Sequence, residues 1–121
     1  MPLPESYTAP TFEPPYRVLV LIASTHAWYT ASRDERARAI EELSALFDRA
    51  TARGARLVGS VDDDLFVTGQ PSSLLYSIYV LLDVDDPGIT VQMVHELRSS
   101  DLGRLLRMET RMGRPLFLLD N

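Results

Sequence analysis

The 121-residue sequence contains no cysteine and no lysine, and it has only two histidines and one tryptophan. Without cysteine the chain has no disulfide, no thiolate metal site and no cysteine nucleophile. His26 and His95 alone are too few for an all-histidine zinc site. The absence of lysine excludes Schiff-base catalysis and lysine-dependent phosphate loops. We therefore expect no bound metal.

The chain also lacks long apolar runs and an excess of positive charge. Its net charge of −5 argues against nucleic acid as the main partner. No stretch approaches the roughly 18 apolar residues of a membrane span. The first residues, MPLPESYTAPTFEPPY, lack the basic and apolar regions of a signal peptide. No G-x-G-x-x-G or P-loop pattern indicates a nucleotide cofactor. We expect a cytoplasmic protein that works without a cofactor and binds neither nucleic acid nor membrane.

The sequence indicates one globular domain that follows a short N-terminal arm. Residues 1–15 hold five of the eight prolines, which is typical of an extended segment. Residues 16–121 are long enough to form a single domain with its own core. The arm is therefore expected to contribute little to folding.

The spacing of apolar residues in this domain predicts four strands and two long helices. Strands are expected at residues 16–24, 55–61, 73–84 and 115–119. Helices are expected at residues 32–53, 89–100 and, more briefly, 101–110. Ser32 and Glu35 form a capping box that begins the first helix, and Gly54 suits its end. HAWYT at 26–30 is expected as a loop, and the aspartates at 62–64 as a turn or bulge rather than a metal site.

This β-α-β-β-α-β order predicts a ferredoxin-like α+β fold, an antiparallel sheet with both helices on one face. The first and third predicted strands, however, carry apolar residues on both of their faces. Leaving the second face in water costs roughly 1.5–3 kcal/mol for each large side chain. We therefore expect a homodimer through the open face, with a barrel-like cavity between or beneath the two sheets.

Two short motifs suggest a family. After the first strand the sequence reads A-W-x-x-x-S-x-x-E-R from Ala27 to Arg36, and E-L-R-x-S follows at residues 96–100. Both motifs resemble the darcynin-like proteins, small dimeric α+β barrels that include a protein of bacterial indole-3-acetate catabolism. More distantly, the layout is similar to the antibiotic-biosynthesis monooxygenases. The resemblance implies a role in aromatic catabolism or natural-product biosynthesis.

Arg36 is the most informative candidate for a site residue. At 100° per residue it lies at the centre of the apolar arc of the first helix, formed by Ile40, Leu43, Phe47 and Ala50. A guanidinium there needs a partner. The partner is expected to be a carboxylate at residues 62–64, or the anion or carbonyl group of a ligand, unless the side chain extends past the core into water.

The HAWYT stretch supplies the aromatic candidates. If the first strand continues by two residues, His26 joins the face of Val20 and Ile22, where it is either a general base or a structural histidine. Trp28 and Tyr29 either close the end of the core or line one end of an apolar pocket.

Tyr76, Tyr79 and Arg98 complete the candidate substrate-binding set. The two tyrosines are expected on opposite faces of one strand, so at most one of them faces the pocket. Arg98 falls at the edge of the apolar face of the second helix. It either reaches the mouth of the cavity or covers apolar surface while its charge stays in water.

These residues favour a small-molecule enzyme that acts on an aromatic or largely apolar substrate. His26 would take the proton and Arg36 would hold the charge of the anion. The reaction is monooxygenase-like, or a hydrolysis, isomerisation or cyclisation. The alternative is a non-catalytic binding or carrier module for the same kind of molecule.

Overall fold

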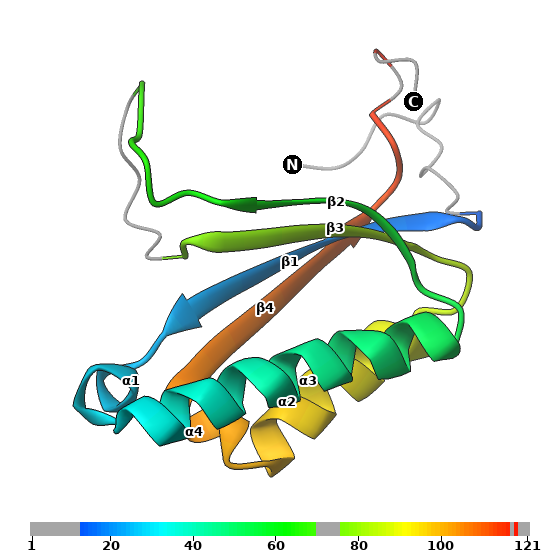
Figure 1. Cartoon of the computed structure of the whole chain (residues 1–121). Coiled ribbons are helices and arrows are strands. Elements are labelled where there is room, and N and C mark those ends of the chain that lie inside the picture. Colours follow the sequence, from blue (N-terminus) through cyan, green and yellow to red (C-terminus); the bar gives the residue numbers. More distant parts are fainter. Residues whose placement is uncertain (1–12, 70–75, 117, 119–121) are drawn as a thin grey trace, which may run out of the picture.

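The computed structural model describes residues 13–69, 76–116 and 118. Its elements follow in the order β1 (Tyr16–Ser24), α1 (His26–Thr30), α2 (Arg33–Ala52), β2 (Arg56–Asp62), β3 (Ile78–Val84), α3 (Gly88–Ser99), α4 (Leu102–Leu105) and β4 (Leu106–Gly113). All four helices lie on the same side of the sheet, with α2 and α3 side by side beneath it (Figure 1).

The four strands form one sheet in the order β2-β3-β1-β4, and every neighbouring pair is antiparallel. β1 and β3 are the central strands, and β2 and β4 form the edges. The ferredoxin-like α+β fold predicted from the sequence is confirmed. No helix in the described part of the chain is long and apolar enough to span a bilayer.

The core lies between the sheet and the helices. Every second residue of β1 faces the helices, and Val18, Val20 and Ile22 are fully buried there. Facing residues from β3, α2 and α3 complete one continuous cluster, among them Leu82, Leu46, Met93 and Leu97. The period of two in the strands and of 3.6 in the helices places these side chains on the two surfaces that meet.

Helix α2 begins and ends as its sequence predicts. The hydroxyl of Ser32 accepts a hydrogen bond from the backbone amide of Glu35, and the Glu35 carboxylate accepts one from the amide of Ser32, which is the predicted capping box. Gly54, just past the helix, has a φ of +117°, a conformation that favours glycine.

The side of α2 that faces the core is rotated about the helix axis relative to the predicted one. Ala39, Leu46 and Ala50 are buried, whereas Ile40 is 61% exposed. The predicted arc took Ile40 as a core residue because it is large and apolar. The small side chain of Ala39 instead points inward, where the helix packs close to its neighbours.

Two elements differ from the sequence-based expectation at the ends of strands. HAWYT forms the one-turn helix α1 rather than a loop. The last strand of the described residues is β4 at Leu106–Gly113, and α4 covers only the first part of the predicted helix at 101–110. Of the predicted strand at 115–119, residues 115, 116 and 118 are not in a strand, and residues 117 and 119 lie outside the described part. The helix-facing positions of β4 alternate as Leu106, Met108, Thr110 and Met112, a period of two that the polar residues between them obscure.

Parts of the expected organisation fall outside the described residues. These include residues 1–12 of the proline-rich arm and the start of the predicted strand at 73–84, of which residues 78–84 form β3.

Candidate functional site

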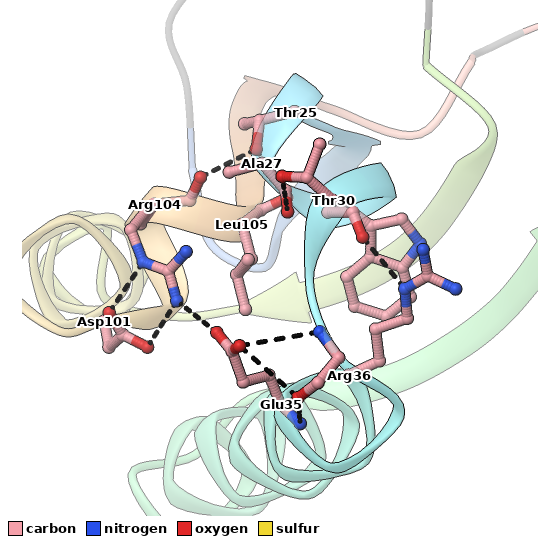
Figure 2. A network of polar contacts seen from close by, with 10 residues as sticks. Thr25, Ala27, Thr30, Glu35, Arg36, Asp101, Arg104 and Leu105 are labelled. Carbon is pink, nitrogen blue, oxygen red and sulfur yellow. Dashed lines mark hydrogen bonds and ion pairs between the residues drawn. The ribbon is translucent and has the colours of Figure 1, made fainter.

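The short helix α1 is fixed to α4 at the end of β1. The backbone amide of Thr25 donates to the carbonyl of Leu105 at 2.9 Å, and its hydroxyl lies within hydrogen-bonding distance of the carbonyls of Arg104 (2.7 Å) and Leu105. Figure 2 shows this corner, where α1, α2 and α4 meet. The chain therefore leaves the sheet at a defined angle and turns at once into HAWYT.

Arg36 on α2 holds the other end of α1. Its Nε donates to the carbonyl of Trp28 at 2.8 Å, and one terminal nitrogen donates to the carbonyl of Tyr29 at 3.0 Å. The guanidinium also lies over the Trp28 ring, 5.7 Å from the ring centroid. The partners of Arg36 are therefore backbone carbonyls and an indole, not the expected carboxylates at 62–64.

An ion-pair network continues from this corner. Arg104 on α4 bridges Glu35, at 2.7 Å, and Asp101, at 3.0 Å (Figure 2). The hydrogen bond from Arg104 lowers the pKa of Glu35, and the Ser32 cap lowers it further. Since Arg104 pairs with both carboxylates and braces α2 against α4, we assign the network a structural role.

The three HAWYT candidates point to different surroundings. Trp28 is half-buried and packs against the core cluster, so it closes the end of the core. Tyr29 is 69% exposed. His26 begins α1 instead of extending β1, so it does not join the face of Val20 and Ile22 as expected. It is exposed and makes no hydrogen bond or ion pair with the described residues.

Tyr79 lies on the open face of the sheet, the face on which none of the described helices packs. It is paired with Leu21 of β1 and Val61 of β2. Its hydroxyl donates to the carbonyl of Tyr76 at 2.9 Å, and hydrogen bonding with Asp63 together with burial raises the pKa of the phenol. Tyr76 itself precedes β3, so of the two tyrosines only Tyr79 is a strand residue.

The centre of this open face is apolar and its margin is charged. Leu19, Leu21, Tyr79 and Leu81 lie on it, and Leu21 is buried without belonging to the core cluster under the helices. Arg17 and Asp83, paired at 2.9 Å, border the strip at one end, and the hydrogen bond from Arg17 lowers the pKa of Asp83. On the edge strand β4, Arg111 pairs with Glu109.

Arg98 is not part of either arrangement. It lies on α3, on the helix side of the sheet, and lines a groove of about 400 Å³ with Val91, Val94, His95 and Thr110. Two further grooves of about 390 and 260 Å³ also lie on the helix side, along α2 and α4. Each of these two is lined by acidic residues that are partly paired with arginine.

The structure therefore divides the predicted site residues among three places. It places Trp28, Tyr29 and Arg36 together at α1, which His26 begins, and Tyr79 on the open face with its hydroxyl on the carbonyl of Tyr76, while Arg98 lies apart. Sequence reasoning missed Asp63 as the neighbour of Tyr79, because the aspartates at 62–64 follow another strand. A signal existed in the antiparallel pairing of two consecutive strands, which places the end of one beside the start of the next.

Comparison with known proteins finds structures of similar fold but identifies no family for this chain. No family model and no curated protein matches the sequence. A mutant chlorite dismutase from Candidatus Nitrospira defluvii, solved in complex with cyanide, is similar with a TM-score of 0.62 at 13% identity, over 88% of this chain and 42% of that chain. A putative chlorite dismutase gives 0.55 at 20% identity, over 83% and 43%.

These similarities show the fold alone, since the identities are low. The chain spans less than half the length of the chlorite dismutase structures that it matches. The resemblance to darcynin-like proteins is supported at the level of the ferredoxin-like α+β fold, and membership of that family is not shown.

Proposed function

We propose that the protein binds a small aromatic or largely apolar molecule at the open face of its sheet, and that a second copy of the chain closes this site. The observation that carries the proposal is the strip formed by Leu19, Leu21, Tyr79 and Leu81, which lies at the centre of a face without helices. A strip of this composition provides an apolar wall with one polar hydroxyl, as is usual for small-molecule sites.

The margin of the same face suits an interface between two copies. A charged rim around an apolar centre is the usual anatomy of a protein interface. Arg17 with Asp83 and Arg111 with Glu109 provide such a rim. Two copies related by a two-fold axis would present the same strip to each other, so that one surface serves both partners.

Residues 63–69 add an apolar surface on the same side. After β2 they rise on the side of the sheet opposite the helices (Figure 1). Leu65, Phe66 and Val67 are 87%, 78% and 71% exposed. Three adjacent exposed apolar side chains favour burial against a partner. We expect them to pack beside the sheet of the second copy and narrow the entrance to the site.

Binding is tested by titrating the protein with a series of small phenols and indoles and following tyrosine and tryptophan fluorescence. Leu81→Asp should abolish binding while the far-ultraviolet circular dichroism stays native. Leu57→Asp, an equally apolar position that is 66% exposed on the edge strand β2, is the matched control and should keep binding. Equal loss in both variants would contradict the assignment to the open face.

Catalysis at this face is the second candidate, and the Tyr79 hydroxyl favours it. The hydroxyl donates its one proton to the carbonyl of Tyr76, so its oxygen can accept a hydrogen bond from a polar group of the substrate. The sequence-based assignment of His26 as the base remains a prediction. Arg36 is the weaker of the two candidates, since its guanidinium already binds the carbonyls of α1.

Turnover of the molecules that bind would distinguish the enzyme from the carrier. If Tyr79 takes part, Tyr79→Phe should retain binding and lose most of the turnover, and His26→Ala should do the same if it is the base. Binding without turnover in the wild-type protein would establish the carrier function and dismiss the enzyme.

A further inference from the structure

The groove between α3 and the edge strand β4 lies on the helix side of the sheet, away from the proposed open-face site. Its volume of about 400 Å³ falls within the usual range of about 300–1,000 Å³ for small-molecule pockets. Four of its lining residues come from one helix: Val91, Val94, His95 and Arg98. Thr110 of β4 forms the opposite wall.

These helix residues lie outside the buried face of α3. Ile89, Met93 and Leu97 of the same helix enter the core, and Thr90 is buried beside them. Positions 91, 94, 95 and 98 recur every three or four residues and therefore lie along one side of α3. Val91 is 69% exposed although it is apolar, so this side offers an apolar surface to a ligand.

The charge of the groove is unusual for this protein. The chain carries a net charge of −5, yet none of the acidic residues that the structure describes lines the groove. The neighbouring carboxylate, Glu96, binds Arg49 and Arg53 of α2 instead. Arg98 makes no ion pair or hydrogen bond with the described residues, and His95 contacts only the Ser99 hydroxyl, at 3.5 Å.

From this arrangement we propose that the groove binds a small organic anion with an apolar body, namely an aromatic or aliphatic carboxylate. The guanidinium of Arg98 matches the two oxygens of a carboxylate, and His95 on the same helix and Thr110 on the opposite wall can add hydrogen bonds. The body of the ligand packs against Val91 and Val94. This site is independent of the open-face site, because the sheet separates the two.

Benzoate is the test ligand, and benzamide, which has the same shape without the charge, is its control. We expect benzoate at millimolar concentration to shift the methyl NMR signals of Val91, Val94 and Thr110, while those of Leu19 and Leu81 stay unchanged. Benzamide should cause smaller shifts. Higher salt should weaken benzoate binding, since the guanidinium is exposed.

Substitution of the arginine then tests its role. Arg98→Gln should weaken benzoate binding about tenfold, because a hydrogen bond to a charged group is lost. Arg33→Gln removes the same charge from an exposed arginine at the start of α2 and should leave binding unchanged. Methyl shifts that are absent, that benzamide reproduces in full, or that Arg33→Gln reduces as much as Arg98→Gln would each overturn the proposal.

Discussion

Alternate residues of strand β1 point to opposite faces of the sheet, and the two sets of side chains differ in their surroundings. On the helix side, Val18, Val20 and Ile22 are fully buried in one apolar cluster. On the other side, Arg17 and Leu19 remain partly exposed, and an ion pair borders the apolar strip. Leu21 on this side is also buried, although no described helix covers it. We propose that the first face specifies the fold and that the second face also serves a partner and a ligand.

The difference between the two faces is tested most strongly by placing the same negative charge on each face of β1 in turn. Val20→Asp buries an unpaired carboxylate in the core, which costs several kcal/mol and should leave the protein unfolded at neutral pH. Leu19→Asp, one residue earlier, should leave a folded chain that no longer dimerises. Circular dichroism and sedimentation velocity report the two effects. An unfolded Leu19→Asp variant would mean that both faces belong to the core.

Gly103 tests how tightly the helix side is packed. A Cβ at this position would lie 2.7 Å from the carbonyl oxygen of Leu97 and 3.1 Å from the Cα of Arg98, so the backbone would have to shift. We expect Gly103→Ala to lower the free energy of unfolding by about 1–3 kcal/mol. Gly113→Ala, at the end of β4 with no atom within 4 Å, is the control and should cost less than about 0.5 kcal/mol. Equal urea-denaturation midpoints for the two variants would contradict this packing.

Glu96 makes the free energy of unfolding depend on pH through its ion pairs on the helix side. Hydrogen bonds from Arg53 and Arg49 lower the pKa of Glu96 from its ordinary 4.5 to about 2. Its contribution to stability is therefore complete above pH 4.5 and is lost as the pH falls toward 2. Glu96→Gln should lower the free energy of unfolding by about 1–2 kcal/mol at pH 7, since the arginines are partly exposed and the pairs are screened. Denaturation of both proteins should give converging stabilities near pH 2, and a constant difference would exclude this origin.

Arg36 lies where the chain leaves β1, and it holds the short helix α1 in place. Arg36→Met removes the donors to the carbonyls of Trp28 and Tyr29, which should lower the free energy of unfolding by about 1 kcal/mol. It should also shift the fluorescence of Trp28, the only tryptophan. Arg33→Met is the control on the same helix. Unchanged stability with reduced ligand binding would instead favour the anion-clamp role that the sequence left open.

Much of the fold could be predicted, because local patterns determine it. β1 at residues 16–24, the capping box of α2 and the end of that helix at Gly54 all follow from short-range rules. β4 could not be placed correctly, because its charged residues Arg107, Glu109 and Arg111 lie on the open face and interrupt the apolar signal. The neighbouring PLFLL sequence at 115–119 matched a strand better by composition alone.

The candidate site was less predictable, since it depends on contacts between distant residues. Placing Arg36 at the centre of a buried arc was wrong because the face of α2 is rotated toward Ala39. Its acceptors are backbone carbonyls, which no residue type in the sequence reveals. Tyr79 could be placed on a face only by the strand register, and Arg98 was assigned to the common pocket because the sequence does not show how far α3 lies from the open face.

The oligomeric state in solution tests the central claim most directly. Sedimentation equilibrium of the wild-type protein at micromolar concentration should give about twice the 13.6 kDa mass of one chain. The mass of Leu81→Asp should fall to that of one chain while its circular dichroism remains native. A wild-type protein that sediments as a folded monomer would contradict the account, because the open face would then have no second copy to close it.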